Sequence, residues 1–348
     1  MILGAITGFI VGLLGIGKLS SESRFIGFIV SMLIIIMFIY LHIIIHEGGH
    51  YIFGRLTNYK FVSFRIGNLT LVKEEKFKIK LFNIKGTAGQ CLMEPPEYNE
   101  DFPYFLYNLG GGLLNIIISL LTIVIVMVNE NLGNLSEILI IFSAVGLYSG
   151  LTNLIPLKLS GISNDGNNII SIKKSNEAKY SFFIQLKVNS LLMKGTRIKD
   201  MPLDWFESIE NLDTRNPISL SRAILRGNYY QDKGELLKAK EIYEDLLKNE
   251  RILGLYKREI ICELIFCEIM TSCDIDKINQ LYNKEIKAYV KQSKHNIGKR
   301  RLLYAYELLV NKDKAKAEKY KKDFNKLLKT YPYKGEIESE LEFMNIIN

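Results

Sequence analysis

The chain has 348 residues, which suits one or two domains, and its formal net charge is +8. Hydrophobic residues make up 48% of it and gather in the first half, whereas the charged residues gather in the second, a pattern typical of membrane spans followed by a basic cytoplasmic tail. No nucleic-acid-binding motif accompanies the positive charge, so we expect no nucleic-acid partner.

The opening residues carry no charged side chain. Residues 1–17 are apolar and glycine-rich but short for a membrane span. They lack the basic start and the clear cleavage site of a secretory signal. We expect an N-terminal apolar helix or a re-entrant piece here, with a short link up to residue 24.

Three later stretches are apolar over the roughly 20 residues that a bilayer requires. We place these spans at about residues 25–53, 102–129 and 138–157. The link at 130–137 holds no Lys or Arg, whereas the chain between the first two spans and the chain after Lys158 are rich in Lys. Because basic loops stay in the cytoplasm, the first span should end, the second begin and the third end on the cytoplasmic side of the cell membrane.

The strongest chemical signal stands at the end of the first of these spans. His46-Glu47-x-x-His50 puts two histidines one helical turn apart, where both can bind one metal ion. Zinc in such a site lowers the pKa of its bound water to near neutral, and the Glu47 carboxylate can take the proton of that water. His42, one turn earlier, is expected to pack there or to support a ligand. A carboxylate-bridged di-iron site would need a second E-x-x-H, which the other spans lack.

Residues 60–85, between the first two spans, have the pattern of a small β-hairpin. Residues 61–72 are rich in β-branched and aromatic side chains, residues 73–75 suit a turn, and residues 76–81 alternate between basic and apolar. The hairpin either merely connects two helices or binds a ligand. In the second case its lysines would meet anionic headgroups, or its edge would hold an extended substrate.

Two further motifs fall at the same side of the membrane. A zinc site needs a third protein ligand, and only His295 remains outside the first cluster, so a carboxylate is required. Asp165 is the candidate, because it follows the cytoplasmic end of the third span. Asn115, after a run of glycines in the second span, either donates a hydrogen bond to a developing oxyanion or bonds to a neighbouring helix.

Residues 175–348 are expected to form a soluble, cytoplasmic, all-helical domain, since Leu, Ile and Tyr recur there at helical spacing. Six residues match the packing positions of a tetratricopeptide repeat: Gly227, Tyr230, Gly234, Ala239, Tyr243 and Leu246. One repeat cannot form a solenoid, so a general bundle of helical hairpins is the other interpretation. Either would dock a protein partner, a substrate tail or a second copy of the chain.

The three motifs together resemble the signatures of the site-2 protease family, over roughly residues 25–170. They are His46-Glu47-x-x-His50, Gly111-Gly112-x-x-Asn115 and Asn153-x-x-Pro156 with Asp165-Gly166. The resemblance implies a membrane-embedded metalloprotease with a three-helix core, in which His46, His50 and Asp165 bind Zn²⁺, Glu47 is the catalytic base and Asn115 lies near the site. The chain departs from the family pattern at Gly48 (usually bulky), at Gly112 (usually Pro) and in its longer gap from Asn153 to Asp165.

We therefore expect a multi-pass α-helical membrane protein with a metalloprotease core at residues 25–174 and the helical domain behind it. The expected function is that of an intramembrane zinc endopeptidase. It would hydrolyse peptide bonds in or next to membrane segments of a small membrane protein or peptide precursor, near the cytoplasmic side. The alternative is a non-catalytic membrane scaffold or adaptor that acts through its helical domain. The intact Glu47 favours the enzyme, because a scaffold needs no ionisable residue at that depth.

Overall fold

A computed structural model describes residues 21–347 except positions 83, 85, 160, 161, 208, 211 and 250. The helix or re-entrant piece expected at residues 1–17 lies outside the described residues. The chain divides into two compact units. The first comprises the chain up to Thr57, Phe105–Leu157 and Asn164–Ile169; the second comprises Asn58–Tyr104, Lys158–Ser163 and the chain from Ile170 onward. The boundaries that we placed at residues 24 and 174 from the sequence stay a prediction.

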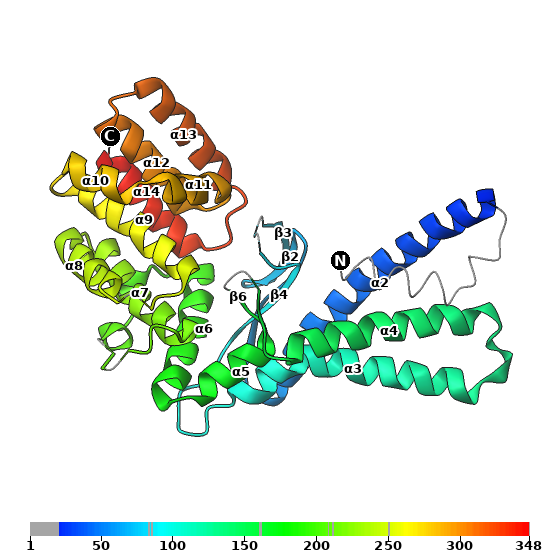
Figure 1. The fold of residues 1–348 in the computed structure, drawn as a ribbon. Helices are drawn as coiled ribbons and strands as arrows, with labels where there is room; N and C mark the ends of the chain where they lie inside the picture. The colour runs from blue at the N-terminus through cyan, green and yellow to red at the C-terminus, as the bar shows by residue number, and fades with distance from the viewer. Residues whose placement is uncertain are drawn as a thin grey trace. The chain divides into compact units, whose positions relative to one another are not determined.

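Three long helices form the first unit: α2 (Ser21–Leu56), α3 (Tyr104–Val128) and α4 (Asn134–Leu154). All three are long and apolar enough to cross a membrane. A short 3₁₀ turn, η2 (Glu130–Leu132), joins α3 to α4, and these two helices run side by side in opposite directions (Figure 1). Large apolar side chains remain exposed along them, which suits contact with lipid.

Small residues let the helices of this unit approach closely. A Cβ atom added at Gly49 of α2 would lie 2.2 Å from the Gly110 carbonyl oxygen of α3. The two backbones therefore touch at this crossing, as small residues permit in membrane helices. Nearer the start of α2, Ile35 and Phe38 pack against Ile141 and Val145 of α4. The first half of α2 is thus held against α4 and its second half against α3.

The second unit contains a four-stranded antiparallel sheet where the sequence predicted a hairpin. Its strands are β1 (Lys60–Ile66), β2 (Leu69–Lys73), β3 (Phe77–Leu81) and β4 (Gly89–Glu94), in the order β3-β2-β1-β4. The prediction was wrong in taking residues 61–72 as one arm. The chain reverses at Gly67, whose φ of +58° is a left-handed conformation that glycine adopts readily.

The outer hairpin of this sheet exposes apolar side chains. Phe77 and Ile79 of β3 are 62% and 70% exposed. The lysines that alternate with them are paired, because Lys78 and Lys80 both bind Glu74, at 2.8 and 2.5 Å. The hairpin therefore offers apolar contact, with much of its basic charge locally compensated.

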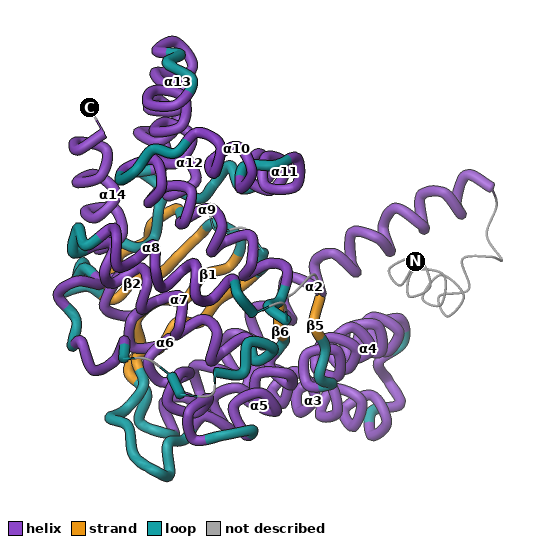
Figure 2. Tube along the Cα trace, turned by 60° about the vertical axis from the view of Figure 1, so that its left-hand side comes forward, coloured by secondary structure: helices purple, strands orange, loops and turns teal. Residues whose placement is uncertain are grey.

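Helices form the rest of the second unit, apart from the short pair β5 (Lys158–Leu159) and β6 (Ile162–Ser163). They are α5 (Asp165–Lys173, shared with the first unit), α6 (Asn176–Lys194), η3 (Ile198–Asp200), η4 (Leu203–Phe206), α7 (Pro217–Asp232), α8 (Leu236–Leu247), α9 (Gly254–Met270), α10 (Ile275–Leu281), α11 (Lys284–Gln292), α12 (Ile297–Ala305), the π-helical η5 (Tyr306–Val310), α13 (Lys314–Leu327) and α14 (Lys334–Ile347). The sheet packs against α6 through Val62, Leu92 and Met193. Figure 2 shows the strands together with α6.

The segment with tetratricopeptide-like spacing forms the helical pair α7 and α8. A Cβ atom added at Gly227 would lie 2.3 Å from the ring of Tyr243, so this glycine makes room for the tyrosine. Gly234 turns the chain between the helices with a φ of +80°. The packing of this one pair agrees with the spacing, but the assignment of a repeat stays a prediction.

The four cysteines are free thiols, three of them buried.

Candidate metal centre

Three side chains from two distant segments meet in the first unit. His46 and His50 lie one turn apart on α2, and Asp165 begins α5. The two Nε2 atoms are 3.1 Å apart, and the Asp165 Oδ2 atom lies 3.2 Å from that of His46 and 3.4 Å from that of His50. Among the described residues, this is the group of His, Cys, Asp and Glu side chains whose ligand atoms converge closely enough to hold a metal ion.

The spacing of these atoms fits zinc. Ligands about 2.0–2.2 Å from a tetrahedral zinc ion lie roughly 3.3–3.6 Å from one another. The three observed separations, 3.1, 3.2 and 3.4 Å, are close to that range. The Asp165 Oδ2 atom is buried and has no hydrogen-bond donor within the described part of the chain. Two imidazoles and one carboxylate would leave a fourth position open, as catalytic zinc sites do.

A backbone contact fixes the ring of His50. Its Nδ1 atom lies 2.7 Å from the carbonyl oxygen of Tyr107, at the start of α3. A carbonyl oxygen can only accept, so Nδ1 carries the proton in the neutral ring. The Nε2 atom is then left with its lone pair facing His46 and Asp165, which is the form that binds a metal.

Asn164 positions Asp165 by joining α4 to α5. Its amide nitrogen donates to the carbonyl oxygens of Thr152 and Ile155, at 2.7 and 2.6 Å. Its amide oxygen accepts from the backbone N–H of Asn167 at 3.0 Å, which caps α5. The gap between Asn153 and Asp165 holds the antiparallel pair β5 and β6, and the carboxylate still lies beside the histidines.

Gly111 leaves the space in which the three donor atoms meet. A Cβ atom at this position of α3 would lie 2.6 Å from the His50 Nε2 atom and 2.7 Å from the His46 Nε2 atom. Both distances are shorter than any ordinary contact. A side chain at residue 111 would therefore occupy the centre that a metal ion needs, and the glycine has a purpose beyond helix packing.

We expect Gly111→Ala to remove bound zinc, from about one ion per chain to less than about a tenth, because the methyl group would enter the coordination sphere. Metal content after desalting of detergent-solubilised protein measures this. Gly48→Ala is the matched control, since a Cβ atom at Gly48 meets no atom within 4 Å. Equal zinc in the two variants would mean that residue 111 does not border the metal site.

Glu47 and Asn115 both lie buried in the same unit. Glu47 follows His46 and is 7% exposed. Asn115 is fully buried on α3, and its Oδ1 atom lies 3.2 Å from the Nδ1 atom of His42 on α2. This contact is a hydrogen bond between two helices, which is the second of the two alternatives given for Asn115 in the sequence analysis. The amide nitrogen of Asn115 is buried and has no hydrogen-bond partner among the described residues.

His42 also contacts α4. Its Nε2 atom lies 2.9 Å from the carbonyl oxygen of Phe142, and the residue is 1% exposed. It therefore links all three long helices near the candidate centre, and it is absent from the metal-binding group. This buried position is the packed one of the two alternatives that the sequence left open for His42. Sequence reasoning missed the roles of Asn164 and Gly111, for which the only signals were a capping residue before Asp165 and a glycine run.

Comparison with known proteins agrees with this geometry. No curated protein and no solved structure matched the chain. A comparison with protein-family models matched residues 33–298, which include the two histidines, Asn115 and Asp165, to peptidase family M50. Because the match spans well over half of the chain, the chain belongs to peptidase family M50, the membrane-embedded metalloproteases of the site-2 protease type.

Proposed function

We propose that this M50 protein is a zinc endopeptidase that hydrolyses peptide bonds in or next to membrane segments of a small membrane protein or peptide precursor. Family membership supports a membrane-embedded metalloprotease. The observation that carries the proposal further is the convergence of His46, His50 and Asp165 within a unit of helices that are apolar enough to span a bilayer. Three ligands with a fourth position open suit catalysis better than a purely structural site.

His46, His50 and Asp165 would hold the ion, and the other residues would handle protons and substrate. Zinc, when bound, would polarise a carbonyl group and lower the pKa of a bound water to near neutral. Glu47 would accept the proton of the attacking water and return it to the leaving amine. Asn115 would donate its free amide N–H to the substrate carbonyl oxygen as negative charge develops there.

We infer that this chemistry takes place near the cytoplasmic face and that the helical domain is cytoplasmic. The loops next to His46 and Asp165 are rich in Lys, whereas the turn between α3 and α4 has none. The apolar outer hairpin, with Phe77 and Ile79 exposed, suits contact with the membrane surface or with an emerging substrate. The tetratricopeptide-like helices would then dock a protein partner, a substrate tail or a second copy of the chain.

Profiling of new peptide termini in membrane fractions tests the proposed activity and does not require an identified substrate. Cells with and without the protein are compared, and we expect termini within or beside apolar segments that occur only when it is present. If none depends on the protein while its cellular role persists with Glu47→Gln, the scaffold or adaptor function would take the place of the enzyme.

A further inference from the structure

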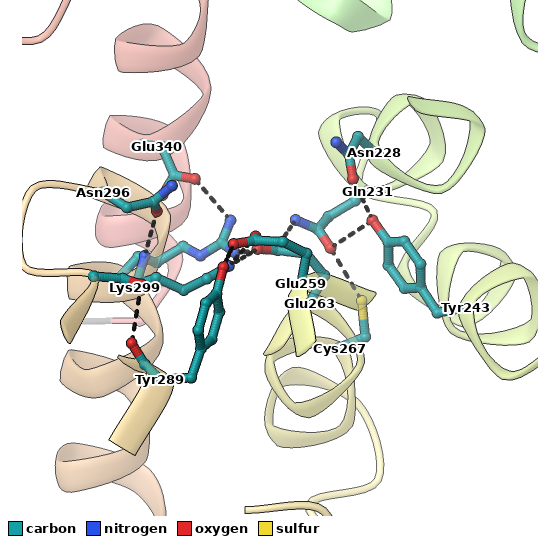
Figure 3. Close-up of polar contacts among 12 residues, drawn as sticks. Asn228, Gln231, Tyr243, Glu259, Glu263, Cys267, Tyr289, Asn296, Lys299 and Glu340 are labelled. Carbon is teal, nitrogen blue, oxygen red and sulfur yellow. Dashed lines mark hydrogen bonds and ion pairs between the residues drawn. The ribbon is translucent and has the colours of Figure 1, made fainter. Parts of the chain in front are cut away.

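A cavity of about 310 Å³ lies among the helices of the second unit. Its walls come from α6, α7, α9, α12 and α14, with the loop before α14. This volume is at the lower end of the range for small-molecule and cofactor pockets. Figure 3 shows part of its polar lining, in which side chains of α7, α9, α12 and α14 point toward one another.

Two buried cationic side chains of this lining are held in place by carboxylates. Lys299 and Arg301 of α12 are each 1% exposed. The Lys299 Nζ atom lies 2.8 Å from Glu259 and 3.0 Å from Glu263, both on α9. Arg301 binds Glu263 as well, and its Nη1 atom lies 3.0 Å from the Glu340 Oε1 atom on α14.

Carboxylates outnumber cations among the groups that line the cavity. The lining has two cationic side chains, Lys299 and Arg301, and four glutamates: Glu259, Glu263, Glu336 and Glu340. The remaining acid of the lining, Asp232, is paired with Arg197. Glu340 is only 6% exposed, and its Oε2 atom has no hydrogen-bond partner in the part of the chain that the structure describes. A buried carboxylate without a full set of partners is costly, so the cavity is suited to a further cation.

The protonation of these carboxylates supports this interpretation. Burial raises the pKa of Glu340 to about 8, although the Arg301 guanidinium acts in the opposite direction. The other charged groups that face it are Glu263, Lys299 and, one turn earlier on α14, Glu336. Burial likewise raises the pKa of Glu336 to about 7, against the hydrogen bond that it accepts from Tyr331. An arriving cation would displace the proton that these acids retain at neutral pH.

The remaining lining has the chemistry of a peptide site. Asn189 of α6 and Asn228 of α7 border the cavity, and within the described residues neither amide nitrogen has a hydrogen-bond acceptor. A side-chain amide offers one acceptor and two donors, which match the N–H and C=O groups of a peptide backbone. Leu192, Ile224 and Phe343 supply apolar walls. A bare metal ion or a polyamine would need neither the amides nor these walls.

We propose that this cavity binds a short peptide through an ammonium group, which is either its free amino terminus or a lysine side chain. Glu340 and Glu336 accept hydrogen bonds from the ammonium group. Asn189 and Asn228 bond to the adjacent peptide backbone, and the apolar walls hold one neighbouring side chain. The site is separate from the proposed metal centre, and its function does not depend on the peptidase activity.

Affinity selection with mass spectrometry tests this on the full-length, detergent-solubilised protein. The probes are three C-amidated tetrapeptide libraries. One is built from Ala, Leu, Ser and Tyr with free amino termini, the second is its Nα-acetylated form, and the third is acetylated but carries one lysine. We expect retention of the first or the third library and none of the second. Retention of the first assigns the terminal ammonium, and retention of the third assigns the lysine.

Variants then connect binding to named groups. For a retained peptide, Glu340→Gln should weaken the affinity by about tenfold or more, because it removes a charged acceptor. Glu342→Gln is the matched control, two residues along the same helix, outside the cavity and half exposed. Asn189→Ala removes no bond within the described protein and should weaken binding by roughly threefold to tenfold. Affinity in the wild type should rise between about pH 5.5 and about pH 7, and less steeply in Glu340→Gln.

Three results would overturn the proposal. One is equal retention of all three libraries, which would show that no ammonium group is recognised. Another is no retention by well-folded wild-type protein. The third is an increase in melting temperature with Ca²⁺ or spermidine that depends on Glu340 while no peptide is retained, because the cavity would then bind a simple cation.

Discussion

Replacing Glu47 with Gln is expected to abolish peptide-bond cleavage while the protein stays folded and keeps its zinc. Gln has nearly the same shape as Glu but cannot accept the proton of the attacking water. The loss of a general base lowers a rate by about 10²–10⁴-fold. Glu47 is buried beside His46 but is not among the three groups whose ligand atoms converge, so the metal should remain. Cleavage of a substrate found by terminus profiling is measured in vesicles, next to zinc per chain.

Glu130→Gln is the control for this comparison. It makes the same chemical change at an exposed acid in the turn between α3 and α4, and cleavage should be unaffected. If Glu47→Gln retained the wild-type rate with full zinc, Glu47 would not be the base. If it lost zinc as well, its role would be structural.

The candidate centre was largely predictable because its geometry follows from regular structure. Two histidines four positions apart on a helix share one face whatever the rest of the fold does. The topology then placed Asp165 at the same depth, and the structure brings all three together. The path of the chain to Asp165 was not predictable, because the hydrogen bonds of Asn164 to Thr152 and Ile155 depend on how the end of α4 is placed.

The sheet shows a different limit of sequence reasoning. The alternation in β3 was a clear signal, but the reversal at Gly67 was hidden inside a run of β-branched and aromatic residues. β4 has no alternating pattern, and its residues are buried because it pairs with β1 and packs on α6. A strand that is covered by its neighbours does not need the polar-apolar alternation that marks a half-exposed one.

The cavity of the helical domain could not be anticipated at all. Lys299, Arg301 and Glu263 occur in segments where charged residues normally face water. Here helices that lie far apart in the sequence enclose them, and each charge is compensated by a partner on another helix. Pairwise burial of this kind leaves no trace in periodicity or composition.

We expect Asp165→Ala to lose its zinc, whereas Glu47→Gln keeps it. Asp165 supplies one of three donor atoms, and removal of a ligand should weaken the affinity for zinc by more than about 100-fold, beyond the effect of changing a residue that only orients a ligand. The alanine side chain leaves the backbone of α5 free to form its helix, and Asn164 still caps it. Metal per chain is measured after equilibration at limiting free zinc, with helix content from circular dichroism.

The pairing of these two variants separates a ligand from a base at the same centre. Both remove one carboxylate charge, so a general electrostatic effect on zinc would appear in both. Zinc lost only from Asp165→Ala identifies Asp165 as the third ligand and agrees with a role for Glu47 in proton transfer rather than in metal binding. Full zinc in a well-folded Asp165→Ala protein would exclude Asp165, and the third ligand would then have to come from a residue that reaches His46 and His50 by a rearrangement of the helices.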